Sequence, residues 1–257
     1  MELDGLPANP QQPHLARRVE FEKAIASYRL SEHARQVVRD TTFAVMTGPT
    51  AAGRNTIIWK LLETGKYRFV ISDTTRPKRQ NNGIWEQDGK QYWFRSEAEF
   101  LRDLQNGEFL EAEIIHNQQV SGISVRELER ANQEQKIAIT DVDIEGIDNA
   151  LRAKSDAFAL LVFPPDFASW QERLAKRGAM TPGELRRRLD TAARIFSLPS
   201  RDARYHVIIN DTVEHAVEQV RDVIEHGKAD PDLQQKAQTI ALHLHDETLR
   251  FLRGLEL

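Results

Sequence analysis

The chain has 257 residues, 40% of them hydrophobic, and its 35 basic and 39 acidic side chains give a formal net charge of −4. This length suffices for a domain with a sizeable core and excludes a fibre or mini-protein, while the charge excludes a broad nucleic-acid-binding surface and no apolar run approaches the roughly 20 residues of a membrane span. There is no Cys, which excludes disulfides and thiolate metal sites and fits a cytoplasmic protein.

The first 40 residues predict an arm followed by a helix. Residues 1–12 are acidic and rich in Pro and Gln, without the basic start and apolar stretch of a secretory signal. Leu15–Arg39 has a helical pattern, as does Pro231–Leu255 at the other end, in residues 227–257. Helices of this kind usually bury one face, so we expect them to pack on the core or to pair two copies as a homodimer.

Between these ends, strands and helices alternate. Short, mostly apolar runs predict strands at Phe43–Met46, Phe69–Ser72, Ile137–Val142, Ala159–Phe163 and Val207–Ile209. Helices are expected at Asn55–Leu62, Ile123–Asn132, Ile144–Ala153, Phe167–Lys176, Pro182–Phe196 and Val213–His226. This alternation is typical of βαβ units, so we predict an α/β fold with a five-stranded parallel sheet flanked by helices.

The pattern changes between Arg76 and about Ser121. Shorter strands of alternating polarity are expected at Gln91–Arg95 and Phe109–Ile115, with a helix at Glu97–Leu104 between them. We interpret residues 76–122 as a small α+β lobe inserted into a domain that covers residues 41–226.

A glycine-containing loop follows the first predicted strand and precedes a helix. It reads Gly48-Pro49-Thr50-Ala51-Ala52-Gly53-Arg54-Asn55-Thr56, and the order of strand, loop and helix is the context of a phosphate-binding P-loop. Its backbone N–H groups and the positive end of the helix dipole suit phosphates. Arg54 stands where the motif has Lys, and a planar guanidinium is not equivalent to an ammonium group. For the loop alone, an ordinary turn between strand and helix is the alternative.

Further segments resemble the guanylate kinase family, in the family's order. Ser72–Arg79 is similar to its Ser-x-Thr-Thr-Arg-x-x-Arg, Asp88–Phe94 to its Gly-x-x-Tyr-x-Phe and Gly107–Glu111 to its Gly-Glu-Phe-Leu-Glu. Later motifs are matched by Asp141–Gly146, Phe163–Pro165, Arg173–Gly178, Arg188–Leu189 and Ile208–Asp211. The resemblance runs from about Thr42 to His226, and it implies a P-loop NTPase-type fold with a GMP-binding lobe and a helical lid at 173–194.

The resemblance implies a kinase that transfers the γ-phosphoryl group of ATP, bound with Mg²⁺, to GMP. The ATP-binding residues would be Gly48, Pro49, Thr50, Ala51, Ala52, Gly53, Arg54, Asn55, Thr56 and Asn210. The GMP-binding residues would be Ser72, Arg76, Arg79, Tyr92, Glu111 and Asp143, and the carboxylate of Glu111 can accept from both N1–H and the amine of guanine. Arg54, Arg173, Arg177 and Arg188 would be the catalytic cations, and Asp141 would hold the metal through water.

Departures from the family pattern leave alternatives open. Val120–Ser124 stands at the family's Tyr-Gly-Thr-Ser hairpin, so that the phosphate-binding Tyr is replaced by Ser121, and Ile195 stands where a lid Glu is usual. With Arg54, these departures leave two alternatives to a GMP kinase: a catalytically silent guanylate kinase-like module that binds a nucleotide or a phosphopeptide, and a kinase for a different small acceptor. The local alternatives are a solvated residue for Glu111 and a turn cap for Asn210.

Overall fold

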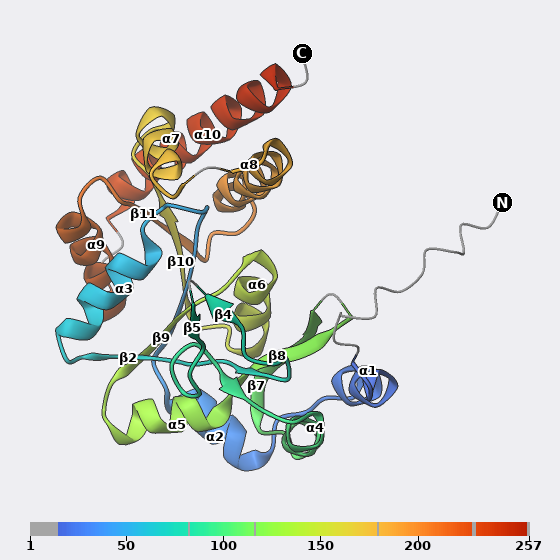
Figure 1. Ribbon diagram of the computed structural model, residues 1–257. Helices are drawn as coiled ribbons and strands as arrows, with labels where there is room; N and C mark the ends of the chain where they lie inside the picture. Colours follow the sequence, from blue (N-terminus) through green and yellow to red (C-terminus); the bar gives the residue numbers. More distant parts are fainter. Residues whose placement is uncertain (1–14, 82, 116, 179, 228–229, 256–257) are drawn as a thin grey trace, which may run out of the picture. The chain divides into compact units, whose positions relative to one another are not determined.

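The computed structural model describes residues 15–81, 83–115, 117–178, 180–227 and 230–255 (Figure 1). Residues 1–12, predicted to form an arm, lie outside the described part. The chain divides into two compact units: unit 1 comprises the described parts of Met1–Asp40 and Val70–Arg130, and unit 2 comprises those of Thr41–Phe69 and Ala131–Leu257. Unit 1 therefore joins the segment of the predicted lobe to the helices that precede the first strand.

Unit 2 is built on a five-stranded parallel sheet with the strand order β11-β10-β1-β9-β2. The strands are β1 (Phe43–Thr47), β2 (Tyr67–Phe69), β9 (Ile137–Asp141), β10 (Phe158–Phe163) and β11 (Tyr205–Ile209). Their near-continuous apolar sequences suit strands that are covered on both faces, and the predicted parallel sheet is confirmed. The strand predicted at Phe69–Ser72 is wrong in its position: Tyr67 and Phe69 pair with β9, whereas the chain after Phe69 already belongs to unit 1.

Helices cover both faces of this sheet. They are α3 (Arg54–Glu63), α6 (Ile144–Ala153), α7 (Phe167–Ala175), α8 (Pro182–Phe196), α9 (Val213–His226) and α10 (Pro231–Gly254), with a 3₁₀ turn at Leu198–Ser200. α3 and α9 lie side by side (Figure 1) and share one buried cluster with the sheet, in which Ile57 and Val220 join Met46. On the other face, Phe196 of α8 meets Phe163 edge-on with ring centroids 5.1 Å apart. The result is a three-layer α/β/α arrangement.

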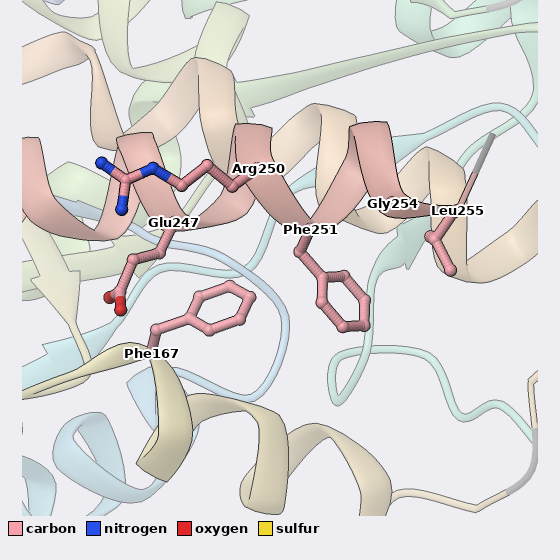
Figure 2. A pocket seen from close by; sticks show the side chains of 6 residues that line it. All are labelled: Phe167, Glu247, Arg250, Phe251, Gly254 and Leu255. Carbon is pink, nitrogen blue, oxygen red and sulfur yellow. The ribbon is translucent and has the colours of Figure 1, made fainter. Parts of the chain in front are cut away.

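α10 packs along α8 and leaves four of its apolar side chains exposed. These are Leu242, Leu249, Phe251 and Leu255. A hollow of about 460 Å³ lies between α7 and α10. The residues that line it are Phe167, Glu247, Arg250, Phe251, Gly254 and Leu255 (Figure 2). None of the residues predicted to bind nucleotides lines it. In the described ranges, no helix combines the length and the apolar character needed to cross a membrane.

Unit 1 contains a four-stranded sheet with the order β6-β3-β8-β7. Its strands are β3 (Asp73–Thr74), β6 (Trp93–Phe94), β7 (Phe109–Ile115) and β8 (Gln119–Ser124), and β4 (Gln80–Asn81) and β5 (Ile84–Trp85) form a separate hairpin. The helices are α1 (Arg18–Ala26), α2 (Glu32–Asp40), α4 (Glu97–Gln105) and α5 (Val125–Gln133), the last of which crosses the boundary between the units. Phe100 of α4 stacks on Phe109 of β7 with ring centroids 4.3 Å apart, and both belong to the buried core of this unit.

Tertiary contacts correct three predictions in unit 1. The single helix predicted at Leu15–Arg39 is wrong because the chain leaves the helix between α1 and α2, where the N–H of Ser31 donates to the carbonyl of Gly107 and its hydroxyl accepts from the N–H of Ala34. The helix predicted from Ile123 begins at Val125, since Ile123 pairs with β7. The strand predicted at Gln91–Arg95 is reduced to β6, which pairs with β3 over two residues.

Candidate functional site

The P-loop in unit 2 needs glycine at both ends. A Cβ atom on Gly48 would lie 2.4 Å from the carbonyl oxygen of Val162. Gly53 has φ +98°, and a Cβ atom there would lie 2.1 Å from Nδ2 of Asn210. Only a residue without a side chain fits these contacts. The loop shape predicted from the two glycines is therefore imposed by packing as well as by conformational freedom.

Two buried side chains hold the loop from outside. Trp170 of α7 donates its indole N–H to the carbonyl of Thr50 at 2.8 Å, and Asn210 donates its amide to the carbonyl of Ala52 at 2.7 Å. Carbonyls bound from behind favour N–H groups that point to the concave side, as in anion-binding nests. Asn210, which is 3% exposed, thus bonds a loop distant in sequence and does not cap its own turn through this amide; its contact with adenine stays a prediction. Trp170 was missed because no sequence motif marks a distant tryptophan.

The first turn of α3 also suits an anion. It contains no acidic side chain, and the first N–H groups of a helix lack acceptors within the helix. Ala51, in the middle of the loop, adopts φ +67°, a left-handed conformation that costs a residue with a side chain free energy. The loop therefore holds a strained backbone at the place where phosphate was predicted.

Arg54 points to the carboxyl end of β9. Its Nη1 donates to the carbonyl of Val142 at 3.1 Å and lies 3.7 Å from Oδ2 of Asp141. Burial lowers the pKa of Arg54; Asp141 and Asp143 favour the charged form, and Arg177 opposes it. Of the predicted residues, the structure thus places Asp141 next to Arg54. To contact a phosphate, Arg54 must share its N–H groups with these acceptors or release them.

The acidic residues after β9 have different surroundings. Asp143 caps α6, where its carboxylate accepts from the N–H of Gly146 at 2.8 Å. Within the described ranges, no group of three or more His, Asp or Glu side chains could hold a metal ion unaided. The carboxylate of Asp141 and the hydroxyl of Thr56 are hard oxygen donors, and Mg²⁺ commonly takes one or two such ligands together with phosphates and water. These residues fit Mg²⁺ that arrives with a nucleotide.

The three lid arginines also lie in unit 2. Arg173, in the last turn of α7, donates to the carbonyl of Asp211 at 3.4 Å. Arg188 of α8 pairs with Glu184 one turn earlier at 2.6 Å, and Arg177 is exposed just after α7. Since exposed pairs along one helix contribute little stability, Arg188 can exchange Glu184 for a phosphate at small cost.

The four-stranded sheet of unit 1 has several of the predicted acceptor residues on one face, whereas Asp143, also predicted to bind GMP, lies in unit 2. In register, Thr74 lies opposite Phe94 and Ser121, and Glu111 lies opposite Ile123. Because side chains alternate along strands, Ser72, Tyr92 and Glu111 project to the side of Thr74. The Arg76 guanidinium lies over the rings of Tyr92 and Phe94, at 4.8 and 5.5 Å from their centroids, and so belongs to the same side. We call this side the acceptor face.

Arg76 has a carboxylate partner that sequence reasoning missed. Glu86, which follows β5, accepts from both terminal nitrogens of Arg76 at 2.6 and 2.8 Å and from the N–H of Arg79 at 2.8 Å. The hydrogen bonds from Arg76 are the main reason that the pKa of Glu86 falls to about 2. Arg76 is only 7% exposed, so a bound phosphate would have to share this guanidinium with Glu86. Arg79 is exposed at the start of the β4–β5 hairpin.

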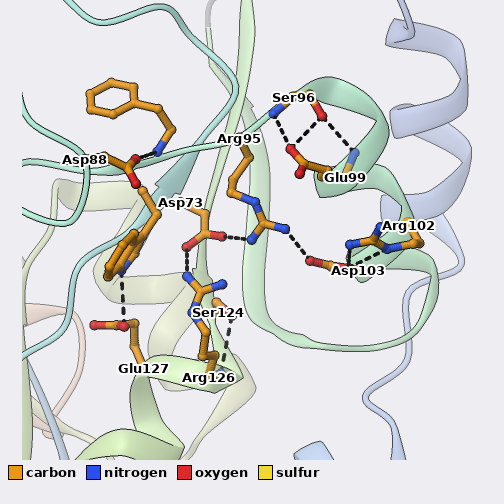
Figure 3. A network of polar contacts seen from close by, with 12 residues as sticks. Asp73, Asp88, Arg95, Ser96, Glu99, Arg102, Asp103, Ser124, Arg126 and Glu127 are labelled. Atoms are coloured by element: carbon orange, nitrogen blue, oxygen red, sulfur yellow. Dashed lines mark hydrogen bonds and ion pairs between the residues drawn. The ribbon is translucent and has the colours of Figure 1, made fainter.

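The opposite side of the same sheet is fixed by buried ion pairs (Figure 3). Asp73, fully buried, accepts from Arg95 at 2.9 Å and from Arg126 at 2.8 Å, and Arg95 also reaches Asp103 at 2.7 Å. Burial raises the pKa of Asp73 even though both arginines favour its charged form. Because Asp73 lies between Ser72 and Thr74, the network fixes the strand that carries these two acceptor-face residues.

Comparison with known proteins decides the family. The guanylate kinase family model matches residues 40–227. The chain belongs to the guanylate kinase family. Guanylate kinases of Thermotoga maritima and Symbiobacterium thermophilum are 33% and 37% identical to it over 186 and 188 residues, which are 72% of this chain in both cases and 86% and 85% of the relatives. The crystal structure of guanylate kinase from Anaplasma phagocytophilum aligns with a TM-score of 0.51 at 23% identity, over 74% of this chain and 88% of that one, and shows the fold alone.

The family match covers only part of the chain. It includes β1 to α9 of the guanylate kinase fold, and therefore both the P-loop and the acceptor face. It ends at residue 227, before α10 begins at Pro231. The hollow in Figure 2, which is formed largely by α10, is thus outside the main part of the guanylate kinase match.

Proposed function

We propose that the chain transfers the γ-phosphoryl group of ATP to GMP, giving ADP and GDP. The observation that carries the proposal is the acceptor face, where Ser72, Arg76, Tyr92 and Glu111 share one side of a small sheet in a chain that also has a P-loop of fitting geometry. Membership of the guanylate kinase family supports it.

In the proposed reaction, a phosphate oxygen of GMP forms a bond to the γ-phosphorus, and the bond from this phosphorus to the oxygen it shares with the β-phosphate breaks. The electron pair leaves with ADP. Positive groups held near the moving phosphoryl lower the barrier because negative charge spreads over its oxygens. Arg54, Arg173, Arg177 and Arg188 would supply them. Mg²⁺, when bound, would neutralise further phosphate charge, with Asp141 as a water-mediated partner and Thr56 as a hydroxyl donor.

On the acceptor side, Arg76, Arg79 and Tyr92 would bind the phosphate of GMP, and Ser72 and Glu111 would bind guanine. A carboxylate that accepts from N1–H and the amine of guanine discriminates against adenine, which lacks both donors at these positions. Asp143 would add a GMP contact through a carboxylate that also caps α6.

The test is ADP release by the purified full-length chain with MgATP and GMP, AMP or no acceptor. We expect release that depends on GMP, and none above background with AMP. The matched variant is Arg54→Lys, which restores the usual P-loop residue. A gain of more than tenfold, about 1.4 kcal/mol of barrier, would mean that Arg54 impairs turnover; an unchanged or lower rate would mean that the loop is adapted to Arg.

A binding module without turnover is the second candidate, because Arg54 bonds the end of β9 and Arg76 is paired with Glu86. Binding of GMP or of a phosphopeptide, with no ADP release for any acceptor, would replace the proposed function by this one. Release that is fastest with another phosphate ester would point instead to a different acceptor.

We also propose that the exposed apolar side chains of α10 pair two copies of the chain, and that the protein works in the cytoplasm. Leu242 and Leu249 are seven residues apart and therefore lie on one side of α10, where they are 55% and 37% exposed. Their burial against a second α10 would remove apolar surface from water.

A further inference from the structure

The acceptor face carries a second row of side chains beside the row predicted to read GMP. Glu111 lies opposite Ile123, and the register of β3 continued by one residue places Ser72 beside Ile123 and Tyr92 beside Ser72. One step along, the same register aligns Phe94, Thr74, Ser121 and Glu113. Residues two apart on a strand share a face at a spacing of about 7 Å. Glu113 is therefore a second carboxylate on the acceptor face, next to Glu111.

The short side chains of this second row form its floor. The hydroxyls of Thr74 and Ser121 lie 2.8 Å apart, and the amide of Gln119 reaches the Ser121 hydroxyl at 3.4 Å. Both hydroxyl residues are buried, whereas Glu113 is half-buried and longer. Glu113 is thus the polar group of the row with the reach to meet a ligand above the floor.

The rows also indicate which part of a nucleotide lies there. Glu111, predicted to bind the base, is on β7 at one edge of the sheet. Arg76 and Tyr92, predicted to bind the phosphate, lie near β6 at the other edge. A nucleotide bound between them extends from β7 across β8 and β3, so its sugar, which is bonded to the base, lies near β7 and β8. Ser121, in place of the bulky Tyr expected from the family pattern, is a small side chain opposite Glu113.

We propose that Glu113 is a specificity-determining residue that accepts hydrogen bonds from the ribose hydroxyls of the acceptor and makes the site selective for ribonucleotides. Two hydroxyl donors suit one carboxylate, which has acceptor capacity only. A hydrogen bond to a charged group is worth enough to give about tenfold or greater preference over an analogue that lacks the hydroxyl. The inference rests on the proposed function, because it uses the predicted placement of base and phosphate.

The experiment is equilibrium binding of GMP and dGMP to the full chain, measured by titration calorimetry without ATP. We expect wild type to bind GMP at least about tenfold more tightly than dGMP. Glu113→Gln should reduce this preference to below about threefold, mainly through weaker GMP binding, because a neutral amide is a poorer acceptor. The matched control, Glu129→Gln on α5, should keep the wild-type preference.

A wild-type ratio near one would overturn the inference, whatever happens to the variant. So would an unchanged ratio in a folded Glu113→Gln protein, as judged by its thermal unfolding. ADP release keeps the two proposals apart: GMP-dependent release with equal affinity for GMP and dGMP would leave the kinase proposal standing and reject the role of Glu113. Loss of the ribose preference in Glu113→Gln, in a protein that releases no ADP, would support the role of Glu113 and reject the kinase proposal.

Discussion

At the scale of single residues, contacts in the structure show roles that the residue type alone does not predict. Asn210 and Arg76 were both predicted to touch ligands, yet each already has a protein partner: the amide of Asn210 holds the P-loop, and the guanidinium of Arg76 holds Glu86. Buried polar groups need such partners, because an unpaired one costs the free energy of removing it from water. Both residues thus stabilise the surrounding chain through contacts within the protein.

Asn210→Ala should weaken both the fold and the donor site. The carbonyl of Ala52 loses its buried donor, so we expect the free energy of unfolding to fall by about 1–3 kcal/mol. The dissociation constant of an ATP analogue should rise, because the loop loses its support from behind. Denaturant unfolding and calorimetry measure the two effects. Asn106→Ala, an exposed amide change in unit 1, is the control; equal ATP affinity in the Asn210 variant and the control would contradict the supporting role.

Glu86→Gln should change the acid stability of the protein. The folded-state pKa of Glu86 is lowered from 4.5 to about 2, so its stabilising effect is complete above about pH 4.5 and is lost as pH falls toward 2. Wild type should therefore lose stability over this range more steeply than Glu86→Gln, as measured by urea unfolding at several pH values. Parallel curves for the two proteins would show that the Arg76–Glu86 pair does not contribute.

At the scale of elements, helix ends were predictable where a capping side chain marks them. α6, α8 and α9 have the predicted bounds, and Asp143, Thr181 and Thr212 cap their first turns by accepting backbone N–H groups. β3, β4 and β5 were missed because strands of two residues carry no periodic pattern. The glycines of the P-loop were visible in the sequence, whereas Trp170 and Glu86 meet their partners only through tertiary packing.

Gly53→Ala should damage the P-loop without unfolding the chain. A methyl group at φ +98° meets Asn210 and strains the backbone, which costs about 1–3 kcal/mol. We expect binding of an ATP analogue to fall at least tenfold, about 1.4 kcal/mol. Gly183→Ala is the matched change: its Cβ would meet no atom closer than 3.7 Å at the start of α8, and it should stabilise by up to about 1 kcal/mol. Similar ATP affinity in the two variants would refute the packing argument.

At the scale of the whole molecule, the residues predicted to bind ATP lie in one compact unit and most of those predicted to bind GMP lie in the other, Asp143 being the exception. The P-loop, Asp141 and the lid arginines belong to unit 2, and the acceptor face belongs to unit 1. α10 lies beyond the family match and adds an apolar surface to unit 2. The proposed transfer uses residues predicted in both units, whereas the proposed pairing through α10 uses unit 2 alone.

Leu249→Glu should separate the proposed homodimer. A carboxylate in an apolar helix pair is costly to bury, so the mass measured by light scattering should fall from two chains to one. Gln238→Glu, on an exposed position of the same helix, should leave the mass unchanged. A wild-type protein of single-chain mass over the whole concentration range would reject pairing through α10.

The central claim, phosphoryl transfer from ATP to GMP, is tested most directly by following the γ-phosphate itself. The full-length chain is mixed with ATP labelled at the γ-phosphate, with MgCl₂ and GMP, and the labelled products are separated. Our account predicts that the label appears in GDP, at a rate that saturates with GMP. In Glu111→Gln the rate should drop at least tenfold, which corresponds to a barrier higher by about 1.4 kcal/mol. Label that stays in ATP, or appears only as inorganic phosphate, would contradict it.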